Sequence, residues 1–308
     1  MNKIALSAEN LTKIYSKNNN LSENVLALNK LNLEVKRGEI FGLLGPNGAG
    51  KTTFINILGG TVTKTSGDVT VWGFNLDKNP RQVRASIGIV PQEVNFDPFF
   101  SPKKLLELQA GFYGVKESER ITELILKTVS LEKQANAYTR SLSGGMKRRL
   151  LIAKAMVHQP PILFLDEPTA GVDVELRKNL WDNVKELKSA GVTIFLTTHY
   201  LYEAQEMCDR IGIINKGNLV ALDSTEKLLE RIESKTIKFK VKNLTQFDKI
   251  RLDGVKFSKN DTGMTAVYNK NKFRFDQIID AVKNNAEILD ISTDDGDLED
   301  IFLQVTNK

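Results

Sequence analysis

Apolar and polar residues alternate along this chain in a way that predicts strands separated by helices. Residues 4–6 and 31–36 alternate apolar with polar side chains, which is typical of half-buried antiparallel strands. Residues 162–165 are apolar without a break, as in a central strand of a parallel sheet. Further strands are predicted at residues 40–44, 69–72, 87–90, 192–198 and 211–214. A 3.6-residue period indicates a helix through Leu176, Leu180, Val184 and Leu187. The sequence therefore predicts an α/β fold with a doubly wound core.

Two parts of the chain depart from this alternation. Residues 94–158 are predicted to form a mostly helical insertion, in which Ser101 and Pro102 start a helix because serine caps free N–H groups and proline fits the first turn. After residue 228 the pattern becomes short and lysine-rich, with strands predicted at residues 237–241, 254–257, 264–268 and 288–291 and helices at 273–282 and 298–305. We therefore expect a large domain over residues 1–228 and a small α+β domain over residues 229–308.

The composition is that of an ordinary globular protein, with 41% apolar and 26% charged residues. The formal net charge of +5 suits polyanionic nucleotides or an anionic membrane surface, but it does not require nucleic acid as a partner. The single cysteine, Cys208, excludes an internal disulfide framework and a multi-cysteine zinc site. No stretch approaches the roughly 18 apolar residues of a membrane span, and the first residues lack a secretion signal. We therefore expect a cytoplasmic protein whose membrane partner, if it has one, is another chain.

The most informative stretch is the glycine-rich run over residues 45–53, which fits the phosphate-binding pattern G-x-x-x-x-G-K-[ST]. A predicted strand leads into it and a helical pattern leads out, so the backbone N–H groups can surround phosphate oxygens. Lys51 would add a charge at the β- and γ-phosphates, and Thr52 an oxygen ligand for Mg²⁺. A chance match in a chain of this length is expected on the order of once in 100. The residues predicted to hold the nucleotide here are Gly45, Pro46, Asn47, Gly48, Ala49, Gly50, Lys51, Thr52 and Thr53.

Polar side chains at the ends of other predicted strands point to the chemistry, because ligands of open α/β sheets bind outside the carboxyl ends of the strands. Asp166 is expected to hold the metal, and Glu167 to orient or deprotonate an attacking water. Gln92 could reach Mg²⁺ or water, and His199 the γ-phosphate. Tyr15 could stack on adenine. Taken singly, each has a plainer structural explanation, and the phosphate-binding run is what favours the functional one.

A second anion site is predicted where residues 142–146, Leu-Ser-Gly-Gly-Met, precede a helical pattern. Free N–H groups at a glycine-opened helix start and the Ser143 hydroxyl can bind an anion. Lys147, Arg148 and Arg149 then fall in the first helical turn, where the helix dipole disfavours cations. Two explanations stay open for these three side chains, namely a docked anion or a solvated run of charge.

Taken together and in this order, the motifs resemble the nucleotide-binding subunit of ATP-binding-cassette (ABC) transporters over about residues 3–225. The resemblance rests on Tyr15, residues 45–53, Gln92, residues 142–146, residues 162–168, Asp173 and His199. Met146 stands where the family usually has glutamine. That departure, the basic run after it and the ending at residues 298–302 are similar to the drug- and polysaccharide-efflux branch of daunorubicin-resistance-like exporters. The loop at residues 170–173, Ala-Gly-Val-Asp, departs from the commonest form, Ser-Ala-Leu-Asp.

This resemblance implies a P-loop NTPase core with an N-terminal antiparallel sheet, the inserted helical subdomain and the small C-terminal appendage. It implies ATP and Mg²⁺ as ligands and a head-to-tail homodimer, since the chain carries one copy of each motif. Each ATP would lie between the phosphate loop of one copy and Ser143, Gly144 and Gly145 of the other, with Asp173 nearby. The implied catalytic residues are Lys51, Gln92, Glu167 and His199, and the implied metal ligands are Thr52, Gln92 and Asp166.

The same resemblance implies that ATP-driven closure and reopening of the dimer works a separate integral-membrane permease. The permease would contact the groove near Gln92 and the helical insertion and would hold the protein at the inner face of the cell membrane. No nucleic acid is expected as a partner. Two other functions stay open: a soluble ABC ATPase without a transport role, and a regulatory module that binds ATP without hydrolysing it.

Overall fold

The computed structural model describes residues 3–16, 24–170, 174–242, 247–260, 263–294 and 296–306. The chain forms two compact units, Met1–Asp223 and Ser224–Lys308, which we describe separately. The division lies just before the expected boundary at residue 228, which falls inside helix α8 (Thr225–Glu230). The Ser224 side chain caps this helix by accepting a hydrogen bond from the Lys227 N–H, and Leu228 is fully buried. Residue 228 therefore belongs to the second unit and not to the first.

A six-stranded sheet with the order β10-β9-β3-β8-β7-β6 forms the centre of the first unit. Its strands are β3 (Ile40–Leu44), β6 (Ile87–Val90), β7 (Ile162–Asp166), β8 (Thr193–Thr198), β9 (Arg210–Asn215) and β10 (Asn218–Ser224). The pairs β6–β7, β7–β8, β8–β3 and β3–β9 are parallel, and every residue of β3 and β7 is buried. Parallel pairing brings the carboxyl ends of β3, β6, β7 and β8 to one edge of the sheet.

The first unit also contains an antiparallel sheet with the order β2-β1-β4-β5. Its strands are β1 (Ile4–Tyr15), β2 (Val25–Lys36), β4 (Ser66–Val71) and β5 (Phe74–Asn75), and α2 (Pro80–Ala85) follows. The predicted alternation holds, because Leu33 and Val35 are buried while Glu34 and Lys36 are exposed. One hydrophobic cluster includes residues of this sheet, of the central strands and of helix α1 (Lys51–Gly59).

Four phenylalanines position α1 on the central sheet. The ring of Phe195 lies 5.4 Å from those of Phe41 and Phe54 and 5.0 Å from that of Phe164, between ring centroids. Each such aromatic pair contributes roughly 0.5–1.5 kcal/mol beyond the burial of apolar area. Because Phe54 belongs to α1 and Phe41 to β3, this cluster fixes the two ends of the glycine-rich run between them.

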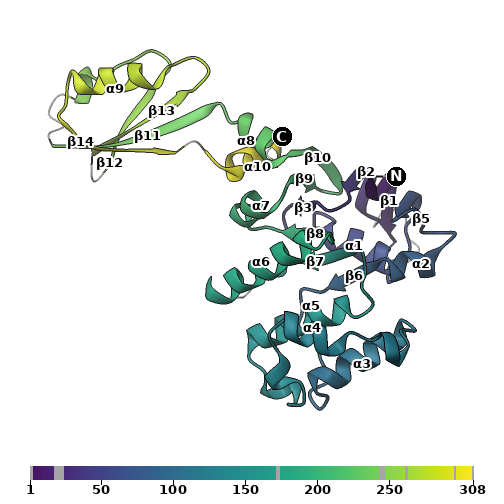
Figure 1. Ribbon diagram of the computed structural model, residues 1–308. Coiled ribbons are helices and arrows are strands. Elements are labelled where there is room, and N and C mark those ends of the chain that lie inside the picture. Colours follow the sequence, from purple (N-terminus) through teal and green to yellow (C-terminus); the bar gives the residue numbers. More distant parts are fainter. Residues whose placement is uncertain are drawn as a thin grey trace. The chain divides into compact units, whose positions relative to one another are not determined.

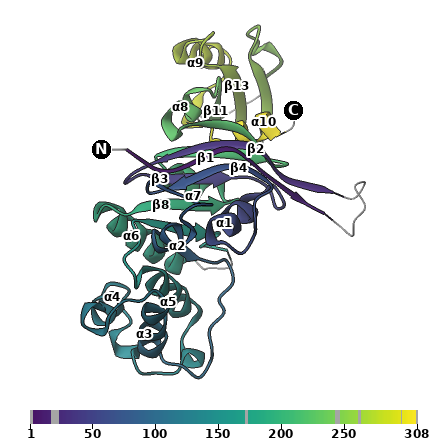
Figure 2. The ribbon, with the colours of Figure 1, turned by 90° about the vertical axis from the view of Figure 1, so that its right-hand side faces the viewer.

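The helical insertion contains α3 (Pro102–Phe112), α4 (Thr122–Thr128) and α5 (Gly144–Met156). Short 3-10 turns connect them at Glu117–Glu119, Glu132–Gln134 and Thr139–Ser141. The Ser101 side chain caps α3, as its position before Pro102 predicts. The three helices share a hydrophobic cluster of their own, which includes the buried residues Leu106, Leu126 and Leu150. They gather on the side of the first unit that lies away from β1 and β2 (Figures 1 and 2).

Helices α6 (Val174–Ser189) and α7 (Leu201–Met207) complete the first unit. Leu180 and Val184, from the stripe with a 3.6-residue period, are buried. Among the helices of the described ranges, none combines the length and apolar character needed to cross a bilayer.

The second unit carries an antiparallel sheet with the order β12-β13-β11-β14. Its elements after α8 are β11 (Ser234–Val241), a 3-10 turn (Phe247–Lys249), β12 (Lys256–Asn260), β13 (Gly263–Asn269), α9 (Phe275–Lys283), β14 (Ile288–Asp294) and α10 (Leu298–Thr306). The strand expected at residues 254–257 begins later, because Gly254 has a φ of 85° and lies in a turn in which the Val255 N–H binds the Leu252 carbonyl. Ile237 and Phe239 of β11 pack with Ile278 of α9 in one cluster.

Candidate nucleotide site

The glycine-rich run forms a loop between β3 and α1, at the carboxyl edge of the central sheet. Gly50 has a φ of 114°, and a Cβ there would lie 2.5 Å from the Ala27 carbonyl oxygen, so only glycine fits. The Lys51 side chain is buried and bends back over the loop, where its Nζ donates to the carbonyls of Gly45 at 2.7 Å and Pro46 at 3.3 Å. The first turn of α1 holds no acidic residue. The positive N-terminal end of α1 and the Lys51 ammonium together favour binding of a phosphate group.

Three of the predicted catalytic side chains contact the fourth, Glu167. Lys51 Nζ lies 3.4 Å from Glu167 Oε1, and Gln92 Nε2 donates to Oε2 at 3.3 Å. His199 Nδ1 lies 3.1 Å from the same Oε2. These groups follow β3, β6, β7 and β8, so the parallel sheet brings to one carboxylate residues that are far apart in the sequence. Glu167 is 7% exposed, whereas His199 and Gln92 face the solvent.

The backbone of Glu167 adopts an unusual conformation. Its φ of 45° lies in the left-handed region, which costs a residue with a Cβ about 1–3 kcal/mol. The Glu167 N–H donates to the carbonyl and to the hydroxyl of Thr197, at 3.1 Å each, and these bonds hold the turn. The sequence did not reveal this conformation, because nothing in the order of residues 166–168 distinguishes it from an ordinary strand end.

The remaining predicted residues lie at the end of β7, on α1 and beside the phosphate loop. Asp166 is the last residue of β7, is 6% exposed, and accepts a hydrogen bond from the Thr197 hydroxyl. Thr52 is exposed in the first turn of α1. Tyr15 ends β1, with its hydroxyl 3.5 Å from Thr53 Oγ1 and its ring 38% exposed beside the loop. The structure thus brings Tyr15 next to the phosphate loop.

The second predicted anion site starts helix α5. The Ser143 side chain caps the helix by accepting from the Met146 N–H at 3.3 Å, and Gly144 and Gly145 are the first two helical residues. Among the described residues, no hydrogen bond joins this segment to the phosphate loop. Asp173, together with residues 171 and 172, lies outside the described residues.

Comparison with known proteins adds to this geometry. The sequence pattern of the family described as ABC transporter matches residues 28–170. The linearmycin resistance ATP-binding protein LnrL of Bacillus subtilis is 38% identical over 234 residues, covering 75% of this chain and 73% of that protein. The Nod factor export ATP-binding protein I of Cupriavidus metallidurans is 39% identical over 228 residues, covering 73% of each. A solved dimeric ATP-binding cassette in a post-hydrolysis state, bound to ADP and Pi, is 27% identical, has a TM-score of 0.62, and covers 71% of this chain and 98% of that one.

The chain belongs to the ABC transporter family. It is an ABC-type ATPase of the export-type group that contains these relatives, and the predicted P-loop fold, ATP binding and ATPase activity are confirmed. Subunits of this family form dimers and work with membrane permeases.

Two arginines of this ABC ATPase behave differently from either explanation that the sequence left open. Arg148 is 6% exposed, and its guanidinium donates to the backbone carbonyls of Pro91, Gln92 and Ala170. Arg149 donates to the carbonyls of Val129 and Ser130. Backbone carbonyls of other loops are the acceptors of both guanidinium groups, so these two side chains do not form a solvated run of charge. Burial lowers the pKa of the Arg148 guanidinium.

A buried carboxylate that sequence reasoning missed lies behind the ATPase site. The Thr169 hydroxyl donates to Glu203 Oε2 at 2.6 Å, and Arg177 Nε lies 3.1 Å from Glu203 Oε1. Burial raises the pKa of the Glu203 carboxyl, while the Thr169 hydrogen bond and the Arg177 charge oppose that rise. Glu203 thereby links the loop after Glu167 to helix α7, which follows His199.

Proposed function

We propose that this ABC ATPase hydrolyses ATP at two sites shared between two copies of the chain and thereby powers export through a separate membrane permease. The observation that carries the proposal is the contact of Lys51, Gln92 and His199 with the single carboxylate of Glu167, beside the phosphate loop. These groups are the ones that phosphoryl transfer to water requires.

The loop over residues 45–53 is proposed to hold the triphosphate, with Lys51 at the β- and γ-phosphates and Tyr15 against the adenine. Thr52, Gln92 and Asp166 would hold Mg²⁺, since hydroxyl, amide and carboxylate oxygens are the ligands this ion prefers. When bound, the ion would neutralise charge on the phosphates. The buried position of Asp166 at the end of β7 and the exposed position of Thr52 on α1 fit this role.

Glu167 is the proposed general base. A water held by its carboxylate attacks the γ-phosphorus, its proton passes to a carboxylate oxygen, and the bond between the γ-phosphorus and the bridging oxygen breaks to release ADP. His199, held through Nδ1 by Glu167, is placed to contact the γ-phosphate with the rest of its ring. Lys51 must leave Glu167 as it engages the phosphates, which frees the base for the water.

The second half of each site is proposed to come from the other copy, through Ser143, Gly144, Gly145 and Asp173. The start of α5 carries free N–H groups and lacks acidic residues in its first turn, as an anion site requires. The chain has one such segment and one phosphate loop, so two copies arranged head to tail complete two sites. A relative solved as a dimer with ADP and Pi supports this arrangement.

The permease is proposed to contact a cavity of about 320 Å³ beside Gln92, whose lining includes Pro91, Glu93, Gln109 and Tyr113. This position would hold the ATPase on the cytoplasmic face of the membrane and connect the permease to the loop that carries Gln92. Relatives named for linearmycin resistance and for Nod factor export support an export role. Nucleic acid is not a proposed partner.

The test is purification of the tagged full chain from detergent-solubilised membranes of its host, with Glu167→Gln in parallel. We expect an integral-membrane chain to accompany it and ATP to pair the Glu167→Gln variant, as seen by light scattering. A chain that hydrolyses ATP at full rate as a monomer and never associates with a membrane protein would contradict the proposal and favour a soluble ATPase. Binding of ATP without turnover would favour the regulatory module.

A further inference from the structure

Arg148 is a buried cation that no carboxylate in the described part of the chain pairs with. Its Nη1 lies 3.2 Å from the Pro91 carbonyl oxygen and 2.7 Å from that of Gln92, and its Nη2 lies 3.4 Å from that of Ala170. A buried charge is costly unless hydrogen bonds satisfy it, so these three carbonyls are needed to keep the guanidinium in place.

The three carbonyls belong to two loops, one after β6 and one after β7, and both loops contact the proposed base, Glu167. The Gln92 side chain donates to Glu167 Oε2, and the Ala170 N–H donates to the Glu167 carbonyl. Arg148 itself lies on α5, about one helical turn after the segment Ser143–Gly145. One guanidinium therefore joins the loops around Glu167 to the helix that begins with the second anion site.

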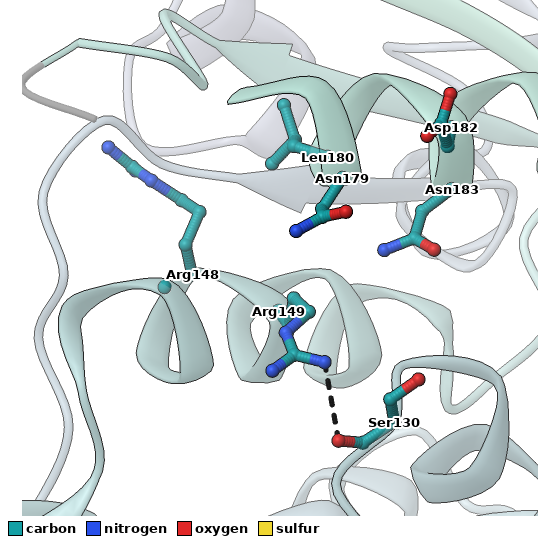
Figure 3. A pocket seen from close by; sticks show the side chains of 8 residues that line it. Ser130, Arg148, Arg149, Asn179, Leu180, Asp182 and Asn183 are labelled. Atoms are coloured by element: carbon teal, nitrogen blue, oxygen red, sulfur yellow. Dashed lines mark hydrogen bonds between the residues drawn. The ribbon is translucent and has the colours of Figure 1, made fainter. Parts of the chain in front are cut away.

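The start of α5 is not closely packed on every side. A cavity of about 250 Å³ separates α5 from α6, with Gly145, Arg148, Arg149, Asn179, Leu180, Asp182, Asn183 and Ser130 in its lining. Figure 3 shows Arg148 and Arg149 leaving α5 in different directions, with Arg149 directed at Ser130. The later part of α5 packs closely on β6, where a Cβ on Gly88 would lie 2.4 Å from the Ala155 carbonyl oxygen. On the side of this cavity, near the start of the helix, the hydrogen bonds of Arg148 connect α5 to the two loops.

We infer that Arg148 is a positioning residue that transmits occupation of the chain's own phosphate loop to the segment Ser143–Gly145, which the chain presents to its second copy. The inference rests on the proposed function for the role of that second copy. The guanidinium is a rigid, permanently charged fork, so a displacement of the Gln92 loop and a displacement of α5 are coupled through it. By linkage, α5 engaged by the second copy would in turn favour nucleotide in the chain's own loop.

Arg149 provides a matched control on the same helix. It is also an arginine bonded to two backbone carbonyls, but Val129 and Ser130 both belong to the helical insertion, as α5 does. Loss of Arg149 should destabilise the insertion without disconnecting it from the Gln92 loop. Arg148→Lys is the conservative variant, since an ammonium can still donate to the nearest carbonyl, that of Gln92.

The experiment compares the full-length parent with Arg148→Gln, Arg148→Lys and Arg149→Gln. Amide hydrogen exchange is measured with and without ATP·Mg at a protein concentration where light scattering shows single chains. We expect ATP to slow exchange over residues 143–147 in the parent and in Arg149→Gln, to leave it unchanged in Arg148→Gln, and to have an intermediate effect in Arg148→Lys. At higher concentration, Arg148→Gln should lose cooperativity and about tenfold or more of its turnover, with single-chain ATP affinity within about twofold.

The same ATP-induced protection in Arg148→Gln as in the parent would overturn the inference, and so would its absence from the parent or its equal loss in Arg149→Gln. If Arg148→Gln does not fold, parental protection in Arg148→Lys with the same cooperativity also overturns it. The two proposals fail separately. If ATP protects residues 143–147 in an Arg148-dependent way but the chains never pair, the shared sites are refuted and the role of Arg148 is supported.

Discussion

Lys51 Nζ lies 3.4 Å from Oε1 of Glu167, and both side chains are almost fully buried. The lysine of the phosphate loop and the proposed base therefore neutralise each other in the absence of nucleotide. We expect a phosphate that enters the loop to compete with Glu167 for the ammonium, so that binding of ATP also releases the carboxylate.

The substitution Glu167→Gln removes the base and the partner charge of Lys51 together. We expect turnover to fall by about 10²–10⁴-fold, the usual contribution of a positioned base. ATP affinity should be retained or increased, because the Lys51 ammonium no longer has to break an ion pair before it binds the phosphates. Single-turnover hydrolysis and equilibrium binding of ATP measure the two effects. Turnover within a few-fold of the parent would remove Glu167 from this role.

Mixing two inactive variants tests whether the sites are shared. Ser143→Arg blocks the start of α5 and Lys51→Ala disables the phosphate loop, so each homodimer lacks two functional sites. A mixed pair regains one complete site, formed by the loop of the first variant and the α5 start of the second. We expect the mixture to hydrolyse ATP faster than the two variants do separately. Activity equal to their sum, with mixed pairs shown by cross-linking, would contradict the head-to-tail arrangement.

His158 should make stability depend on pH. Its ring stacks on Tyr113 with centroids 3.6 Å apart, and its Nε2 lies 2.9 Å from the Ile87 carbonyl oxygen. Its Nδ1 is buried without a hydrogen-bond partner in the described part of the chain. Burial lowers the pKa of His158 below its ordinary value of 6.5, so the unfolded chain takes up a proton before the folded chain does. Stability is therefore full above that value and is lost as the pH falls below it.

The measurement is the free energy of unfolding by denaturant between about pH 7.5 and about pH 5.5, a range that spans the ordinary histidine pKa. His158→Gln keeps an N–H donor for Ile87 but cannot titrate. We expect its free energy of unfolding to fall less over this range than that of the parent. An identical fall in both proteins would show that His158 does not titrate differently on folding.

Gly42 and Cys208 should be energetically coupled. A Cβ on Gly42 would lie 2.7 Å from Cys208 Sγ and 3.1 Å from Leu44 Cδ1, inside a strand with no free space. We expect Gly42→Ala to cost about 1–3 kcal/mol of stability, as overpacking of a core does. Cys208→Ala in the same chain should recover part of this loss, because it removes the nearest atom. A double-mutant cycle measures the coupling, and strict additivity would contradict the predicted clash.

The sequence was sufficient to predict which residues lie together at the ends of the parallel strands. The loop at residues 45–53, Gln92, Glu167 and His199 each follow an apolar run, and parallel strands must bring such ends to one edge. The helix start at Ser101 was predicted for a similar reason, since a cap is a local property of a few adjacent residues.

Contacts between distant loops could not be predicted in this way. The acceptors of Arg148 are backbone carbonyls, which carry no side-chain identity that a sequence could reveal. Nothing in the sequence around Glu203 distinguishes this residue, and only the fold shows that Thr169 and Arg177 contact it. The predicted start of β12 was also wrong. The apolar alternation at residues 254–257 indicated a strand, but Gly254 has a positive φ and the strand starts at Lys256.

The left-handed φ of Glu167 strains the backbone at a position where the side chain is also needed. Glycine there would relax the backbone, yet it would remove the proposed base and leave the buried Lys51 ammonium without its carboxylate partner. The gain from the backbone, roughly 1 kcal/mol, is smaller than the cost of leaving a buried charge without a partner, so glycine would lower stability as well as activity. The strained backbone at position 167 is therefore the cost of placing one carboxylate where it can both pair with Lys51 and face the proposed water.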